Sequence, residues 1–116
     1  MKKDIKVYLQ DIIDSLTKIE QYIKSIDEKE FFNNSQLQDA IFRRLEIIGE
    51  ATKNIPQPFR NKYPNIPWKQ IAGMRDVLIH EYDSVDIDRI WQVAKNDVPK
   101  LKQKIKKINK KLNISK

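Results

Sequence analysis

The sequence of 116 residues predicts an all-α fold, an up-and-down bundle of four main helices that forms a single domain over residues 1–116. Apolar residues recur at intervals of three and four along four stretches of the chain, as they do on one face of a helix. No strand-like alternation rivals these patterns, and four of the five prolines lie between the second and third stretches. A chain of this length buries about two-thirds of its unfolded surface, which is enough for one core.

The first two helices are predicted from their apolar stripes. The first runs from about residue 4 to residue 26, and its buried face is Ile5, Tyr8, Ile12, Leu16, Ile19, Tyr22 and Ile23. The second starts at Ser35, which can form a capping box with Gln38, and it stops at Pro56. Its buried face is Leu37, Ile41, Leu45, Ile48, Ala51 and Ile55.

The second half of the chain is predicted to hold a connector and two further helices. Residues 56–67 carry four prolines, so they form a connector with room for one short helical turn. A third helix runs from Pro67 toward His80, with Trp68, Ile71, Met74 and Leu78 on its apolar face. Asp86 caps a fourth helix, which Pro99 should kink or divide. Its apolar positions are Ile87, Ile90, Trp91, Ala94, Val98, Leu101, Ile105, Ile108 and Leu112.

Scarce residue types exclude several classes of protein. Cysteine is absent and histidine occurs once, which excludes disulfides, thiolate zinc sites and multi-histidine metal centres. Two glycines, Gly49 and Gly73, cannot build the glycine-rich loop of an ATPase, a kinase or a dehydrogenase. Both fall inside predicted helices, where close helix approach would explain them. Asp83, Asp86 and Asp88 could hold magnesium, but an N-cap and a solvated first turn explain them better. No metal or cofactor is therefore expected.

Positive charge is concentrated at the C-terminus. The formal net charge is +7, yet residues 98–116 hold eight lysines and no acidic residue, so residues 1–97 carry −1. A lysine-rich helix at about residues 100–116 can bind nucleic-acid phosphates, attract acidic lipids or simply stay solvated. No apolar run approaches the ~20 residues of a membrane span, and the N-terminus lacks a signal-peptide core. These features predict a cytoplasmic protein.

The octet at residues 75–82, RDVLIHEY, is the candidate functional site. It places the single histidine near a fixed cation and a modifiable hydroxyl, groups that suit phosphate chemistry. On a helix, Asp76 and His80 would share a face, and the aspartate would orient the imidazole and raise its pKa. Arg75 and His80 would be about 140° and about 7.5 Å apart on a straight helix. The two side chains converge only if the helix ends and the chain bends near His80, or if a two-fold partner supplies a second Arg75 and His80. Both are expected to contribute.

RNA suits a cleft lined by two arginines and two histidines of a symmetric dimer. Its 2′-hydroxyl is an internal nucleophile, so cleavage needs no metal. His80 would then transfer a proton while Arg75 stabilises the charge that develops on the phosphate. The structural alternatives are a helix-end role for His80, an ion pair of Arg75 with Asp76 or with Glu81 of the partner subunit, and core packing of Tyr82.

Two longer segments resemble a known family. Residues 67–82 read PWKQIAGMRDVLIHEY and continue into Val85-Asp86, Trp91 and Asp97-Val98-Pro99. Residues 40–51 read AIFRRLEIIGEA and contain a Leu-Glu-x-Ile-Gly-Glu-Ala segment. Over about residues 4–112, the chain resembles the HepT-like branch of the HEPN superfamily.

This resemblance implies a homodimeric helical bundle and a metal-independent endoribonuclease, the toxin of a type VII toxin–antitoxin pair. By the family's Arg-x-x-x-x-His-x-Tyr pattern, Arg75 and His80 would be catalytic and Asp76 would support them. Tyr82 matches the tyrosine that a cognate MntA-type nucleotidyltransferase antitoxin adenylylates, in a pair that can build a larger hetero-oligomer. The added AMP would bring bulk and negative charge that repel an RNA phosphate.

The lysine-rich end would then assist RNA binding. The candidates are Lys102, Lys104, Lys106 and Lys107, whose phosphate contacts would weaken as salt rises. Two other functions stay open from the sequence. One is a non-catalytic subunit that binds nucleotide or substrate for a nucleotidyltransferase partner, and the other is a purely structural helical interaction module.

Overall fold

The computed structural model describes residues 4–79 and 85–114. Every regular element in these ranges is helical, so the prediction of an all-α fold is confirmed. The long helices are α1 (Ile5–Ile23), α3 (Ser35–Lys53) and α8 (Val98–Ile114). The short elements are α2 (Glu28–Phe32), α4 (Gln57–Asn61), α5 (Trp68–Ala72), α6 (Met74–Leu78), α7 (Ile87–Gln92) and the π-helical turn η2 (Val93–Asp97).

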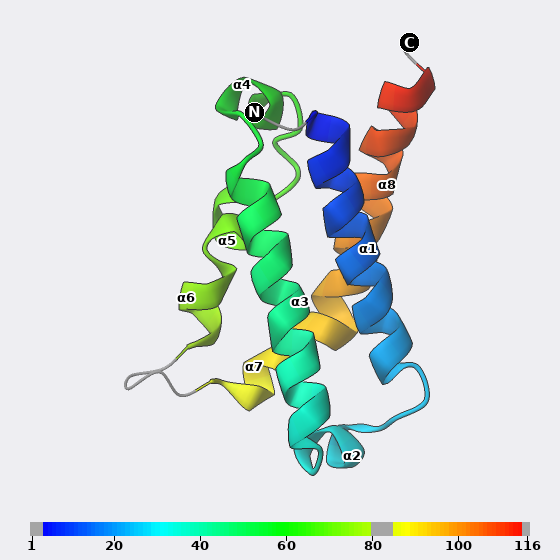
Figure 1. The fold of residues 1–116 in the computed structure, drawn as a ribbon, viewed down its shortest axis with the longest axis vertical. Coiled ribbons are helices and arrows are strands. Elements are labelled where there is room, and N and C mark those ends of the chain that lie inside the picture. The colour runs from blue at the N-terminus through cyan, green and yellow to red at the C-terminus, as the bar shows by residue number, and fades with distance from the viewer. Residues whose placement is uncertain (1–3, 80–84, 115–116) are drawn as a thin grey trace.

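The three long helices lie side by side, with α1 between α3 and α8 (Figure 1). The short helices α5 and α6 pack on α3, and α7 crosses near the start of α3. In Figure 1 the chain runs down α1, up α3, down through α5 and α6, and up again along α8. The alternation of direction agrees with the predicted arrangement. Four continuous helices are not present in the described residues, because the third pass consists of two short helices.

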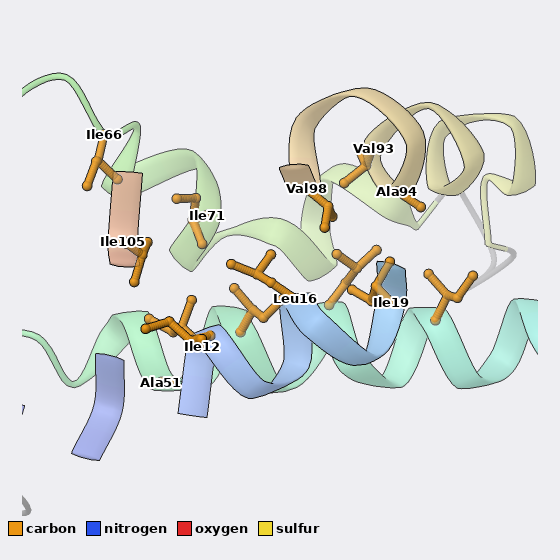
Figure 2. Close-up of a cluster of buried hydrophobic side chains, with 14 of the residues drawn as sticks. Ile12, Leu16, Ile19, Ala51, Ile66, Ile71, Val93, Ala94, Val98 and Ile105 are labelled. Atoms are coloured by element: carbon orange, nitrogen blue, oxygen red, sulfur yellow. The ribbon is translucent and has the colours of Figure 1, made fainter. Parts of the chain in front are cut away.

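The hydrophobic core lies where α1, α3 and the η2–α8 segment face one another (Figure 2). Ile12, Leu16 and Ile19 of α1 point into it and are at most 1% exposed. Val93, Val98 and Ile105 line the opposite side of the core. The apolar spacing predicted the burial of Val98 and Ile105 but not that of Val93. Each fully buried aliphatic side chain contributes about 1.5–3 kcal/mol relative to an exposed one, so this cluster fixes the long helices.

Polar caps set the helix starts in the first half of the chain. The Asp4 carboxylate accepts from the Lys6 N–H and starts α1, which ends at Ile23, short of the predicted residue 26. Helix α3 begins at Ser35 as predicted, but its cap is the Asn34 side chain, which accepts from the Leu37 N–H at 3.0 Å. The predicted capping box is therefore wrong.

Two short helices flank α3. The Gln38 amide donates to the Phe31 carbonyl and so holds the end of α2, a helix of five residues that was too short for the periodicity to predict. Helix α3 ends at Lys53, ahead of the predicted stop at Pro56. The connector contains the single short helix α4, as predicted.

Gly73 divides the segment that was predicted as one third helix. Its φ of −93° and ψ of 20° depart from helical values, so α5 ends before it and α6 begins after it. The other glycine confirms the predicted close approach. A Cβ built on Gly49 of α3 would lie 3.2 Å from the Ile71 carbonyl oxygen, closer than most Cβ contacts. Glycine at position 49 thus lets the backbone of α5 rest on α3.

Asp86 caps α7 by accepting from the Arg89 N–H at 3.0 Å, which confirms its predicted role. The interruption predicted at Pro99 is also present. Proline cannot donate to the carbonyl four residues earlier, and its ring crowds that carbonyl. The preceding turn widens into η2, in which the Val98 N–H reaches back to the Val93 carbonyl.

Candidate active site

Helix α6 presents Arg75, Asp76 and Val77 to solvent, and Leu78 anchors it in the core with 0% exposure. Its first turn starts at Gly73, whose carbonyl accepts from the N–H groups of Asp76 and Val77. The break at Gly73 therefore sets the direction in which Arg75 leaves the bundle.

The chain turns away from helical geometry directly after Leu78. Ile79 has φ −105° and ψ 126°, and it forms an isolated antiparallel bridge with Val85. The Asp86 N–H donates to the Leu78 carbonyl at 2.7 Å. These contacts hold Ile79 and Val85 together beside the last turn of α6. His80 and Tyr82 belong to the segment 80–84 and lie outside the described residues.

The end of α6 corrects one expectation from the sequence. Placing Asp76 and His80 on a common helix face requires a helix through residue 80, but α6 ends at Leu78 and Ile79 is extended. A spacing of four residues therefore does not predict their contact. The bend expected near His80 is present in the backbone at Ile79. The contribution of a second Arg75 and His80 from a two-fold partner stays a prediction.

Arg75 is held by an ion pair across two helices. Its Nε lies 3.3 Å from Oε2 of Glu46 on α3, while Oε1 of Glu46 lies 3.7 Å from Nη1 of Arg43. An interhelical ion pair was one structural alternative for Arg75, although the sequence pointed to Asp76 or Glu81 as its partner. The Arg75 side chain is 62% exposed, and ion pairs this exposed contribute about 0–1 kcal/mol to stability. The pair therefore affects the orientation of Arg75 more than the stability of the fold.

Sequence reasoning missed Glu46 because nothing along the chain pairs residues 46 and 75. A usable signal was present, since Glu46 lies three residues before Gly49 on α3. The contact of Gly49 with α5 brings that face of α3 against the chain that leads into α6. A charged residue one turn from such a contact is well placed to meet an exposed arginine on α6.

A groove of about 350 Å³ lies beside α6, between it and the η2–α8 segment. Its α6 wall includes Met74 and Val77, and Val77 is 44% exposed. The charged residues that line it are Arg89, Asp97, Lys100 and Lys104. Cations thus outnumber acids around an apolar groove that adjoins the helix of Arg75.

The four lysines predicted to bind RNA divide into two kinds. Lys102 pairs with Glu20 of α1 at 2.7 Å, and Lys104 donates to the Asn65 carbonyl at 3.1 Å. Lys106 and Lys107 are exposed on α8. The first two hold α8 against neighbouring parts of the chain, whereas the second two present their ammonium groups to solvent.

Residues 4–79 and 85–114 contain no group of three His, Cys, Asp or Glu side chains arranged to hold a metal ion. Of the acidic residues near α7, Asp86 serves as the N-cap and Asp88 is exposed in the first turn. Asp83 lies outside the described residues. Within the same ranges, none of the helices is both long and apolar enough to cross a membrane.

Comparison with known proteins gives one consistent group of relatives. The family model described as "Ribonuclease HepT-like" matches residues 12–108. The chain is 44% identical over 110 residues to "Probable ribonuclease HepT" of Thermococcus cleftensis, covering 95% of this chain and 100% of that one. It is 42% identical over 106 residues to an RNase-designated protein of Caldanaerobacter subterraneus subsp. tengcongensis, covering 91% and 95%.

A longer relative comes from Methanocaldococcus jannaschii. Its name joins gamma-glutamylcyclotransferase with an RNase designation, and the identity is 52% over 116 residues. The match covers all of this chain but 52% of that protein, so this chain spans about half of its length. No solved structure gives a significant match.

Proposed function

Because the chain belongs to the HepT-like ribonuclease family, we propose that it is a metal-independent endoribonuclease that acts as the toxin of a type VII toxin–antitoxin pair. The observation that carries this proposal is the family match over residues 12–108, which includes the whole octet at 75–82. The exposure of Arg75 on the helix that leads into the bridge between Ile79 and Val85 supports it.

The proposed reaction uses the RNA as its own nucleophile. The 2′-oxygen attacks the adjacent phosphorus and loses its proton, the P–O5′ bond breaks, and the departing 5′-oxygen gains a proton. The products are a 2′,3′-cyclic phosphate and a 5′-hydroxyl. His80 transfers a proton in this step, and the Arg75 guanidinium stabilises the extra charge on the phosphoryl oxygens.

Control of the activity is proposed to act at Tyr82. A nucleotidyltransferase antitoxin of the MntA type would join the tyrosine oxygen to the α-phosphorus of ATP and release pyrophosphate. The attached AMP places a phosphate and a nucleoside two residues from His80, where they oppose binding of an RNA phosphate. Such neutralisation leaves the helical fold intact, so the modified protein stays folded.

The test is RNA cleavage by the purified chain in EDTA, compared with the His80→Ala variant. We expect the wild type to keep its rate in EDTA and the variant to be slower by about 10²–10⁴-fold, the usual effect of losing a general acid or base. The variant should unfold at the wild-type temperature. Equal cleavage by the two proteins would exclude this function, and tight nucleotide binding without any cleavage would favour the non-catalytic subunit.

A further inference from the structure

The ion pair between Glu46 and Arg75 has its closest approach at one nitrogen of the guanidinium. The carboxylate of Glu46 meets the guanidinium at Nε, with 3.3 Å between Nε and Oε2. A guanidinium carries five N–H donors, of which Nε supplies one and the two terminal nitrogens supply four. In the described part of the chain, the terminal nitrogens of Arg75 make no ion pair or hydrogen bond. Among the described residues, no group occupies the edge of the guanidinium that recognises a phosphate bidentately.

Glu46 is itself held in place. It is the less exposed member of the pair, with 25% side-chain exposure against 62% for Arg75. It lies in the middle of α3, one turn before Gly49, whose close packing against the Ile71 carbonyl fixes the distance between α3 and α5. The more rigid carboxylate thus constrains the more exposed guanidinium.

We propose that Glu46 is the positioning residue for Arg75: it holds Nε so that the two terminal nitrogens face the RNA phosphate. This inference rests on the proposed ribonuclease function and names a residue that the octet does not contain. Glu46 does not itself touch RNA. Its negative charge opposes RNA binding while its contact improves the geometry of the arginine, so its removal should separate binding from catalysis.

The decisive variant is Glu46→Gln, which keeps the shape and removes the charge. We expect kcat for RNA cleavage to fall about 10- to 100-fold, because misplacing a catalytic group by about 1 Å has effects of that order. KM should stay the same or decrease, since one negative charge has been removed near a polyanion site. Glu46→Asp keeps the charge on a shorter side chain and should restore part of kcat.

Glu50→Gln is the matched control. Glu50 lies on the same helix and forms an ion pair with Lys53, three residues later. Glu46 likewise forms an ion pair with Arg43, three residues earlier. The control removes the same charge from α3 without touching Arg75, so its kcat should equal that of the wild type. Arg43→Ala should also keep kcat, because it leaves the contact between Glu46 and Arg75 in place.

A second measurement follows the Arg75 side chain directly. In protein labelled with ¹⁵N-arginine, the Nε–H signal that disappears in Arg75→Ala is assigned to Arg75. We expect this signal to broaden or shift in Glu46→Gln and to stay unchanged in Glu50→Gln. The inference is overturned if Glu46→Gln retains wild-type kcat, or if the Nε–H signal of Arg75 is the same in this variant as in the wild type. A wild-type chain that does not cleave RNA would overturn the proposed function instead, and the Nε–H signal would still test the role of Glu46.

Discussion

Arg75 occupies a position at which lysine could not serve in the same way. One end of its guanidinium meets Glu46 through Nε, and the terminal nitrogens have no ion-pair partner among the described residues. A lysine ammonium has three N–H donors on one nitrogen, so it could contact the carboxylate and a phosphate but could not offer the phosphate a planar bidentate edge. The residue type at position 75 thus follows from the contact with α3 as well as from the proposed chemistry.

Tyr82 gives a prediction that separates modification from cleavage. Tyr82→Phe removes the hydroxyl that would accept AMP and leaves Arg75 and His80 in place. We expect the variant to cleave RNA within about 3-fold of the wild type but to gain no AMP when it is co-expressed with the nucleotidyltransferase, because the accepting oxygen is gone. Intact-mass analysis measures the modification. Tyr63→Phe, at a tyrosine packed on Phe59, is the control and should still be modified through Tyr82.

At the residue scale, the sequence identified groups with unusual chemistry and missed their tertiary contacts. His80 stood out because it is the single histidine, and Arg75 because of its spacing from His80. Glu46 is one of sixteen acidic residues, and its place in the Leu-Glu-x-Ile-Gly-Glu-Ala segment does not indicate a contact with Arg75. Its importance arises when α3 and α6 pack together, an event that depends on long-range contacts.

The two glycines lead to opposite predictions at the level of helices. In Gly49→Ala, the new methyl group presses on the Ile71 carbonyl, so we expect a loss of about 1 kcal/mol in the free energy of unfolding despite the better helix propensity of alanine. In Gly73→Ala, the nearest atom is the Lys69 carbonyl oxygen at 3.5 Å, and φ is negative. This variant should be neutral or more stable by about 0.5 kcal/mol.

Urea unfolding measures both glycine variants. A Gly49→Ala protein at least as stable as the wild type would mean that α5 can shift away from α3 at little cost. The claim that position 49 fixes the distance between these helices would then be wrong.

The apolar periodicity predicted the long helices well and the third one poorly. Trp68, Ile71, Met74 and Leu78 are spaced as on one continuous helix, and all of them contact the core in the structure. Two five-residue helices with a break at Gly73 keep the same side chains on the same side. The pattern therefore could not locate the break, and neither could it predict α2, which buries only Phe31.

The exposed lysines of α8 should contribute to RNA binding, and the paired ones should contribute to stability. Replacing the exposed Lys106 and Lys107 by glutamine should weaken RNA binding and lower the salt dependence of log K by about 0.7–0.9 for each phosphate that is no longer neutralised. Lys102→Gln removes the ion pair with Glu20, so it should affect stability more than RNA binding. Fluorescence anisotropy at several salt concentrations gives the slopes. Equal slopes for the double variant and the wild type would exclude this end of α8 from the RNA site.

At the scale of the whole molecule, the geometry of the proposed active site depends on how many chains contribute to it. Arg75 leaves the bundle from α6, and the chain bends at Ile79 before His80. Val77 of α6 is exposed, and it lines the apolar groove beside that helix. An exposed apolar surface of this kind can contact a second copy of the chain, which would complete the site. A proposed homodimer would bring two such faces together about a two-fold axis.

Mixed dimers decide whether Arg75 and His80 act from the same protomer. Arg75→Ala and His80→Ala chains, co-expressed with different tags, would each be inactive as homodimers. If the two residues meet across the two-fold axis, each mixed dimer holds one complete site. Random assortment makes about half of the dimers mixed, and each has one complete site of two, so we expect about a quarter of wild-type activity.

A bend within one chain predicts a different result for the same mixture. Every protomer would then lack one of the two residues, and the mixture would be as inactive as the separate variants. Purification through both tags enriches the mixed dimers, so their activity should approach half of the wild-type value if the site is shared. Wild-type protein carrying the same two tags sets the reference, and sedimentation shows whether dimers form. An inactive, dimeric mixed sample would assign both catalytic residues to a single chain.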